Sequence, residues 1–562
     1  MKGSQAVIAC LKEQGVDTIF GYPGGMILPL YDALYDDHSI EQILVTHEQN
    51  AAHAADGYAR ATGKVGVCIA TSGPGATNLV TGLATAFMDS IPVVAITGQV
   101  DTSLLGRDAF QEIDILDITM PITKHNFKVK NSRYLVQTIR DAFEIARSGR
   151  RGPVLIDIPR DIFFADVPYS EKIPAEKILG KPDPDFLICV AEAIEELTAA
   201  KKPVAIIGGG AISAEASAEI QKFVEHFDLP AVNTLMGLGS IPRSHKNNLG
   251  FAGMHGQKAA NHAVAEADLV VAIGSRFGDR QTGNLSKYTS GRKFIHIDID
   301  PAEIDKNVAN SLGLAGDMKT ILNLLMKKES IDRSNRPDRV AWWNMIESWS
   351  EEYDYDYQVS RLTVPWALHQ VALETAGKNF AFATDVGQHQ MWSALHLRIE
   401  QPRTWFTSGG LGTMGFGLPA AMGAQVAFKK SGSDRRVVHV VGDGGIKMTG
   451  NEFYTIARLK LPIISLIVNN TSLGMIRQLQ KVMYKEHYIA CEFDYPMDYV
   501  SYVKSFGIFA EEVSTQEEFA NAFRKAMNDP ENPRVIVLNV WRSFVEPMIK
   551  GGARIDEFVE FK

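Results

Sequence analysis

Short apolar runs rich in β-branched residues recur along this chain, separated by segments long enough to form helices. They read VGVCIA, IPVVAITG and GPVLIDIP near the start, KPVAIIGGG, ADLVVAIGS and KFIHIDID in the middle, and RVVHVVGDGG, LPIISLIVNN and PRVIVLNV towards the end. A strand with one face in water alternates apolar and polar residues, whereas a continuous apolar run indicates a strand buried on both faces. The pattern therefore predicts α/β architecture, in which parallel sheets are covered by helices on both sides.

The chain is too long for one domain. At 562 residues, and with roughly 100–200 residues per domain, three or four domains are expected. Two charged, proline-bearing stretches, residues 170–185 and 327–340, are poor in large apolar side chains and are predicted to be linkers. We therefore expect three doubly wound parallel-sheet domains, over residues 1–170, 186–328 and 360–545.

The composition is that of an ordinary globular protein. The net charge of −9 argues against nucleic acid as the main partner, because a phosphate-binding face usually needs an excess of basic residues. Cys10, Cys68, Cys189 and Cys491 are widely spaced and form no CxxC pair, so neither a disulfide framework nor a zinc site is predicted. Residues 65–88 carry no charge, but a Ser-Gly-Pro-Gly turn and several threonines disfavour a membrane helix. We expect a cytoplasmic protein with no membrane or nucleic-acid partner.

Two polar loops follow apolar strands in the last domain. They are GDGG at residues 442–445 and the Asn pair at 469–470, separated by a length that fits one helix and the return strand. Ligands bind at the carboxyl ends of strands in doubly wound sheets, so Asp443 and Asn470 can offer oxygen to one hard cation such as Mg²⁺. The alternative is that Asp443 forms an Asx turn and Asn470 caps a helix. Either loop alone fits that alternative, whereas the pair favours the metal.

Together the two loops resemble the motif of thiamine-diphosphate enzymes, GDG followed by NN. In that family the Asp, the second Asn and a main-chain oxygen two residues beyond hold magnesium. The resemblance therefore implies that Asp443, Asn470 and the main chain of Ser472 are the metal ligands.

Glu48 is the candidate for the acid that a thiamine enzyme places against the aminopyrimidine ring. It follows the predicted strand EQILVT and begins an alanine-rich helix whose small side chains allow close approach. Such a carboxyl must be buried, so its pKa is expected above that of a free glutamate. Taken alone, Glu48 is explained more simply as a first-turn acid stabilised by the helix dipole.

Further motifs favour the catalytic interpretation of Glu48. FGYPGG, HEQNAAHAADGYARATG, TSGPGATNL and GRDAFQE appear in order, followed by SGRRGPVLIDIPRD, GMHG, GSRFGDR, DVGQHQMW and GGLGTMGFGLPAA. Over essentially the whole chain they resemble the catalytic large subunit of acetohydroxyacid synthase, also called acetolactate synthase. The resemblance implies decarboxylation of pyruvate on thiamine diphosphate. It also implies condensation with a second 2-keto acid, pyruvate or 2-oxobutanoate, in the first common step of branched-chain amino acid biosynthesis. The products are 2-acetolactate or 2-aceto-2-hydroxybutanoate.

The resemblance also implies how the site is divided between subunits. The amino-terminal domain of one subunit binds the pyrimidine and the carboxyl-terminal domain of another binds the diphosphate, which requires a homo-oligomer, either dimer or tetramer. Whether a small regulatory subunit binds is left open. Glu48, Gly25, Gln111 and Phe110 are implied at the reaction centre. The other implied cofactor contacts are Tyr22, Pro23, Val386, Gly387, Gln388, His389, Gly412, Met414, Gly442, Asp443, Gly444, Gly445, Asn470, Ser472, Leu473, Gly474 and Met475.

The middle domain resembles the flavin domain of the biosynthetic synthases, in which FAD is structural. By itself AIIGGGAIS is a weak dinucleotide fingerprint, because Ser213 stands where the third glycine belongs. For Arg276 the alternatives are the carboxylate of the second substrate, which a guanidinium can bind with two hydrogen bonds, or a salt bridge to Asp279 or beside the flavin. The implied FAD contacts are Arg150, His255, Gly274, Ser275, Arg276, Asp298 and Asp317.

Three positions depart from the family. Leu479 stands where most members have a tryptophan in the substrate channel, which predicts a weaker preference for 2-oxobutanoate over pyruvate. Lys447 replaces an amide and either meets the diphosphate or points to solvent. Gly445 replaces a serine.

Other functions remain as alternatives. Pyruvate oxidase is a related enzyme in which the flavin is redox-active, while glyoxylate carboligase is disfavoured because it lacks the activating acid. A catalytically inactive scaffold is disfavoured by the presence of Glu48, Asp443 and Asn470.

Overall fold

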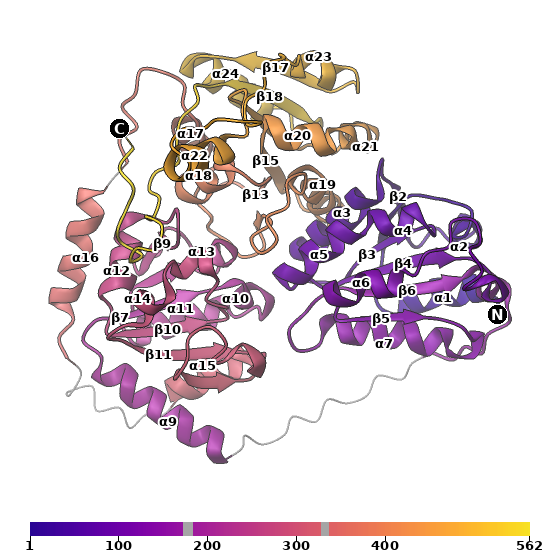
Figure 1. Cartoon of the computed structure of the whole chain (residues 1–562), viewed down its shortest axis with the longest axis horizontal. Helices are drawn as coiled ribbons and strands as arrows, with labels where there is room; N and C mark the ends of the chain where they lie inside the picture. The colour runs from indigo at the N-terminus through magenta and orange to yellow at the C-terminus, as the bar shows by residue number, and fades with distance from the viewer. Residues whose placement is uncertain (172–183, 328–336, 354, 562) are drawn as a thin grey trace.

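Three parallel sheets, each of six strands, build the molecule (Figure 1). Every pairing between these strands is parallel, and helices cover the sheets, which confirms the predicted fold class. The two predicted linkers fall largely outside the described residues, which leave out 172–183 and 328–336. The structure is a computed structural model that describes residues 1–171, 184–327, 337–353 and 355–561.

The first sheet has the strand order β2-β1-β3-β4-β6-β5. Its strands are β1 (Thr18–Gly21), β2 (Glu41–Leu44), β3 (Gly66–Ala70), β4 (Val93–Gln99), β5 (His125–Lys128) and β6 (Val154–Pro159). Its helices are α1 (Gly3–Glu13), α2 (Leu28–Tyr35), α3 (Glu48–Thr62), α4 (Pro74–Asn78), α5 (Val80–Asp89), α6 (Ile115–Thr119), α7 (Leu135–Arg147) and α8 (Arg160–Phe164).

The middle sheet has the order β12-β11-β10-β7-β8-β9, the order of dinucleotide-binding folds. Its strands are β7 (Pro203–Ile207), β8 (Ala231–Asn233), β9 (Asn248–Phe251), β10 (Leu269–Ile273), β11 (Lys293–Asp298) and β12 (Leu312–Ala315). Its helices are α9 (Pro184–Ala199), α10 (Gly209–Ser213), α11 (Ser217–His226), α12 (Lys258–Glu266), α13 (Asp279–Thr282), α14 (Leu285–Thr289) and α15 (Met318–Lys327), and α16 (Val340–Glu352) follows.

The third sheet has the order β14-β13-β15-β16-β18-β17, which repeats the topology of the first. Its strands are β13 (Phe380–Thr384), β14 (Trp405–Phe406), β15 (Arg436–Gly442), β16 (Ile464–Asn469), β17 (Phe509–Val513) and β18 (Arg534–Asn539). Its helices are α17 (Val364–Thr375), α18 (Gln388–His396), α19 (Gly417–Lys430), α20 (Asp443–Thr449), α21 (Phe453–Arg458), α22 (Gly474–Met483), α23 (Tyr499–Lys504) and α24 (Gln516–Met527).

The first and third domains share one hydrophobic core, which runs through the contact between α3 and α19. Glycines let the two helices approach closely. A Cβ on Gly57 of α3 would collide with the carbonyl oxygen of Ala420, and a Cβ on Gly423 of α19 would collide with that of Ala54. The contact is therefore reciprocal, and backbone lies against backbone on both sides.

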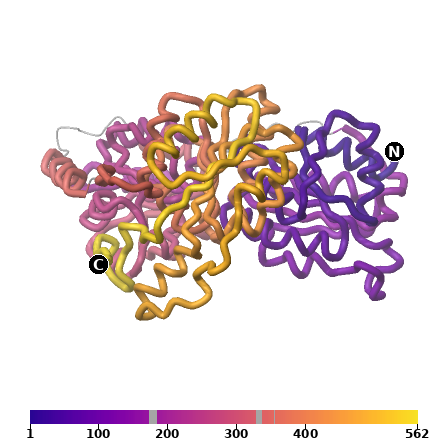
Figure 2. Tube along the Cα trace, turned by 90° about the horizontal axis from the view of Figure 1, so that it is seen from above, coloured from indigo at the N-terminus to yellow at the C-terminus, as the bar shows by residue number. Residues whose placement is uncertain are grey.

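The chain returns from the third domain to the middle one at its carboxyl end. Figure 2 shows the two termini at opposite ends of the molecule, with the C-terminal segment beside the middle domain. There the N–H of Ile549 donates to the carbonyl of Met254 at 2.9 Å. Among the described helices, none has the length and apolar character needed to cross a bilayer.

Candidate active site

The polar loops of the third domain lie at the carboxyl ends of its central strands, β13, β15 and β16. The chain passes from β13 to β14 on one side of the sheet and from β15 to β16 on the other, and doubly wound sheets bind ligands at the point where this order reverses. Val386 and Gly387 follow β13, Asp443 follows β15 and Asn470 follows the next strand, β16. Strand order thus places the predicted diphosphate residues at one edge of one sheet.

Glycines bring these loops into direct contact. A Cβ on Gly387 or Gly442 would lie 3.0 Å or 3.1 Å from the imidazole ring of His389. A Cβ on Gly444 would lie 2.6 Å from Leu473 and 3.2 Å from Met414.

The remaining glycines of these loops are constrained in the same way. A Cβ on Gly474 would collide with the side chain of Gln388. A Cβ on Gly445 would lie 2.7 Å from the carboxylate of Asp385. Four segments that are far apart in the sequence therefore form one cradle.

The oxygen atoms of Asp443 and Asn470 converge. The N–H of Ser472 donates to Asp443 Oδ2 at 3.2 Å and to Asn470 Oδ1 at 3.1 Å, so both acceptors lie around one amide. Asp443 is buried, and burial raises the pKa of its carboxyl to about 6 although the Lys447 ammonium opposes the shift. A buried carboxylate beside an amide oxygen fits a hard cation, which would offset the cost of burying the charge.

No group of three or more His, Cys, Asp or Glu side chains forms a metal site among the described residues. A cation bound by Asp443 would therefore take its other ligands from amide, main-chain and ligand oxygens. That ligand set suits magnesium, which is commonly held by one or two carboxylates together with phosphate oxygens.

His389 leaves a polar atom unpaired at the same edge. Its ring is buried, and burial lowers the pKa of the imidazole to about 3, so it is neutral at physiological pH. Its Nε2 has no hydrogen-bond partner among the described residues. Buried polar atoms are almost always paired, so this atom indicates a place for a bound group.

Glu48 begins α3 in the first domain, with its side chain buried. Its Oε2 accepts a hydrogen bond from Asn78 Nδ2 at 2.9 Å, and a Cβ on Gly75 would lie 3.2 Å from Oε1. A Cβ on Gly73 would lie 2.9 Å from Gln111, which itself adopts a φ of 60°. The glycine turn after β3 therefore brings Glu48 and Gln111 to one edge of the first sheet.

The other predicted residues of the first domain lie at the surface. Phe110 is 82% exposed and Tyr22 is 42% exposed, and both Gly25 and Pro23 are at least partly open to solvent. No hydrogen bond or ion pair between described residues joins this cluster to the cradle of the third domain.

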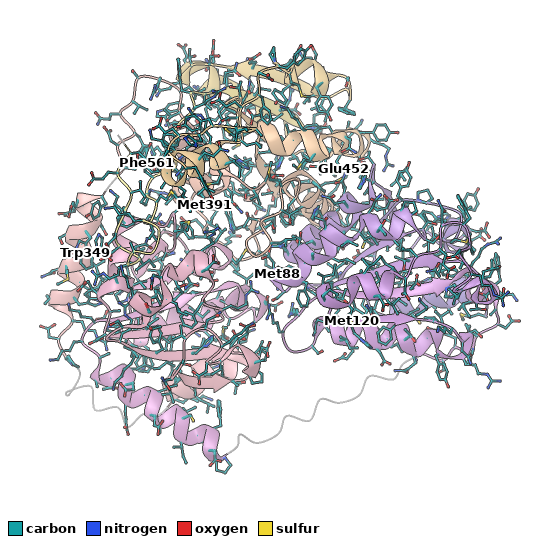
Figure 3. The ribbon with its side chains drawn as sticks, in the orientation of Figure 1. Met88, Met120, Trp349, Met391, Glu452 and Phe561 are labelled. Carbon is teal, nitrogen blue, oxygen red and sulfur yellow. The ribbon has the colours of Figure 1, made fainter. Side chains whose placement is uncertain are left out.

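A cavity of about 960 Å³ lies where the three domains meet. Figure 3 marks its position by Met88 of the first domain and Met391 of the third, which both line it. The predicted channel residue Leu479 lines it as well, next to Met475. The cavity also brings together every predicted FAD residue: Arg150, His255, Gly274, Ser275, Arg276, Asp298 and Asp317.

Arg276 is half-buried in this cavity. Burial, reinforced by Arg150, lowers the pKa of its guanidinium. Asp279 lies 3.9 Å from Arg280, and no ion pair joins Asp279 to Arg276 among the described residues. The guanidinium of Arg276 is therefore available to an anionic ligand.

Lys447 lies above an aromatic ring. Its Nζ is 3.3 Å from the centroid of the Phe493 ring, and the N–H of Phe493 donates to the Thr471 carbonyl, in the loop after β16, at 2.9 Å. The ammonium is held beside the cradle by a cation–π contact.

The sequence interpretation did not single out Asp385. This buried carboxylate follows β13 and accepts the N–H groups of Val386, Gly415 and Gly417 at 2.8–3.1 Å. Burial raises the pKa of Asp385 to about 6. It fixes the turn beside Met414, and an acid at the end of a buried strand was the signal that could have found it.

Family comparisons agree with this geometry. The chain matches the N-terminal TPP binding domain of thiamine pyrophosphate enzymes over residues 1–118, the central domain over 190–325 and the C-terminal TPP binding domain over 385–540. These three matches define the class as thiamine pyrophosphate enzymes.

Full-length relatives narrow the class. A probable acetolactate synthase large subunit of Methanocaldococcus jannaschii is 41% identical over 100% of this chain and 95% of its own length. The acetolactate synthase large subunit of Parasynechococcus marenigrum is 44% identical over 96% and 88%. The acetolactate synthase isozyme 3 large subunit of Escherichia coli is 40% identical over 99% of this chain and 98% of its own length. The chain belongs to the family of acetolactate synthase large subunits.

Proposed function

We propose that this protein is a thiamine-diphosphate-dependent acetolactate synthase of branched-chain amino acid biosynthesis. It joins the two-carbon unit of pyruvate to a second 2-keto acid, pyruvate or 2-oxobutanoate. The observation that carries the proposal is the convergence of Asp443 and Asn470 beside the glycine cradle, in a chain similar to these synthases along its whole length.

The cradle residues would hold the cofactor. Asp443, Asn470 and the main chain of Ser472 would bind Mg²⁺, and the unpaired Nε2 of His389 would face the bound cofactor. Gly387 and Gly444 leave room for the phosphate groups because neither has a side chain. Bound thiamine diphosphate would supply the electron sink for decarboxylation.

Glu48 would exchange a proton with the aminopyrimidine ring. Since Oε2 accepts from Asn78, the free oxygen Oε1 is the atom that would carry the proton. Gly25, Phe110 and Gln111 would border the reacting groups, and Tyr22 and Pro23 would line the entrance. The exposure of Phe110 and Tyr22 supports a homo-oligomer in which a second chain covers them.

The cavity between the domains would bind FAD. Its volume and the middle sheet's strand order suit a dinucleotide, and the net reaction transfers no electrons, so the flavin would be structural. Arg276 would bind the carboxylate of the second 2-keto acid with paired hydrogen bonds. The relatives are called large subunits, which supports a smaller partner chain for this protein also.

Product analysis tests the proposal. Wild type and Glu48→Gln are incubated with pyruvate, thiamine diphosphate, Mg²⁺ and FAD, and the products are identified by mass spectrometry while oxygen is monitored. Acetolactate from the wild type and almost none from the variant is the expected result. Acetate or acetyl phosphate with oxygen uptake would instead identify an oxidase.

A further inference from the structure

Glu452 is a buried acid that the proposed reaction does not use. It ends the short 3-10 helix η7 (Gly450–Glu452), which continues directly from α20, the helix that begins with Asp443. Figure 3 shows it where the first and third domains meet. Its side chain is 0% exposed.

One oxygen of this carboxyl accepts three hydrogen bonds from the first domain. Glu452 Oε1 lies 2.7 Å from the N–H of Thr46, 2.6 Å from its hydroxyl and 2.9 Å from Asn50 Nδ2. Thr46 and Asn50 stand two residues before and two residues after Glu48. The carboxyl of Glu452 is therefore hydrogen-bonded to residues on both sides of the proposed activating acid in the sequence.

Helix α21, which follows η7, also bonds to the chain segment that leads to Glu48. Thr455 Oγ1 and Arg458 Nη2, both in α21, donate to the carbonyl of Leu44 at 3.3 Å and 3.1 Å. Leu44 is the last residue of β2. The third domain therefore holds the chain at Leu44 and at Thr46, before Glu48, whereas Glu48 itself is oriented from its own domain by Asn78.

The hydrogen bonds from the first domain need only one acceptor oxygen on residue 452. The second oxygen of Glu452, Oε2, has no partner among the described residues, and the same is true of Asn50 Oδ1. A glutamine could therefore accept the same three hydrogen bonds, and burying an incompletely paired carboxyl costs free energy. The connection is thus expected to depend on where the acceptor oxygen lies and not on its charge.

We propose that Glu452 is a positioning residue for the Glu48 carboxyl. By tying Thr46 and Asn50 to the segment that carries Asp443, it fixes where α3 begins and therefore where Glu48 Oε1 lies. This inference rests on the proposed role of Glu48 as the activating acid.

Glu452→Ala and Glu452→Gln separate positioning from other effects. The alanine variant removes all three hydrogen bonds, whereas glutamine retains an acceptor oxygen in the same place. Thr85→Val is the matched control, because it removes a buried 2.7 Å hydrogen bond between the Thr85 and Thr413 hydroxyls, which joins the same two domains and involves no residue of 44–50.

Two measurements report on position rather than turnover. Amide hydrogen exchange of residues 44–50 in the cofactor-free protein is expected to accelerate in Glu452→Ala and not in Thr85→Val. Deuterium exchange at C2 of bound thiamine diphosphate, followed by NMR, is expected to slow about 100-fold in Glu452→Ala, since a misplacement of 1 Å can cost that much. Glu452→Gln should stay within about fivefold of wild type in both measurements, and KM for pyruvate should change by less than about threefold in either variant.

Other results overturn the proposal. Wild-type C2 exchange in Glu452→Ala would contradict it, as would an equal loss in Thr85→Val, which would indicate general destabilisation. A glutamine variant as slow as the alanine variant would show that charge, not hydrogen bonding, is required. Failure of the proposed function is distinct, because wild type and Glu48→Gln would then exchange C2 at the same rate.

Discussion

The first and third domains share a strand order but carry different chemistry. In both, the second strand lies outside the first, and the helix that follows it packs against its counterpart: α3 against α19, with Gly57 and Gly423 in reciprocal contact. The loops differ, however. The third domain buries Asp385 and Asp443 in loops that follow its strands, whereas the first domain buries Glu48 at the start of α3.

This difference shows that topology positions a site while loop residues decide what it can bind. Converging oxygen atoms and side-chain-free glycines suit a metal ion and a diphosphate. A single carboxyl among small, uncharged neighbours suits an aromatic base. The first two predictions below each alter one side of this comparison and leave the other side intact. The next two alter the contact between the domains and the channel.

The largest effect is expected on the side of the first domain. Glu48→Gln should lower kcat about 10³-fold, within the range of general acid–base catalysis, because the amide cannot exchange the proton. Binding of Mg²⁺ with thiamine diphosphate should be unchanged, since no metal ligand is altered. Stopped-flow assays and calorimetric titration measure the two effects, and a parallel loss of metal affinity would show that the two sides are not independent.

The reciprocal change is Asp443→Asn, which should abolish tight Mg²⁺ binding. In the wild type, the raised pKa of about 6 means that the carboxyl is protonated below that pH. Metal affinity in the presence of cofactor should therefore fall roughly tenfold per pH unit below pH 6 and level off above it. Titration calorimetry between pH 5 and pH 8 measures this, and a pH-independent affinity would exclude Asp443 as a ligand.

The contact that joins the two domains can be tested by stability. Gly57→Ala should lower the free energy of unfolding by about 1–3 kcal/mol, because the new methyl group meets the backbone of Ala420. Gly551→Ala is the control, since a Cβ there has no atom within 4 Å. Urea unfolding compares the two variants, and equal stability would mean that α3 and α19 are not packed as described.

The smallest effect concerns the channel. Leu479→Trp should raise the share of the 2-oxobutanoate product about fivefold in an equal mixture of the two acids, because the ring adds contact area for one methylene. Gas chromatography of the products measures the ratio. If the wild type already favours 2-oxobutanoate strongly, the prediction drawn from Leu479 is wrong.

Much of the fold could be predicted because its central strands are buried on both faces. RVVHVVG became β15 and ISLIVN became β16 as the apolar runs indicated. Edge strands gave weaker signals: β5 is only partly buried, and β14 has two residues. Their pairing depends on neighbours that are distant in the sequence.

The candidate site also has features that the sequence predicts and features that it does not. The loops around Asp443 and Asn470 could be expected to meet, because parallel strands end at one edge. The hydrogen bond between Glu452 and Thr46 joins residues about 400 positions apart in the sequence. The cavity among the three domains depends on how the domains pack. Local pattern contains no information on either feature.

The most direct test of the central claim is complementation between two inactive variants. If one chain supplies Glu48 and another supplies Asp443, a hybrid of Glu48→Gln and Asp443→Asn chains contains one intact site. Co-expressed with two different tags and purified through both, this hybrid should show about half the wild-type rate of acetolactate formation per dimer. A hybrid as inactive as its parents would mean that both halves come from one chain, and would contradict the account.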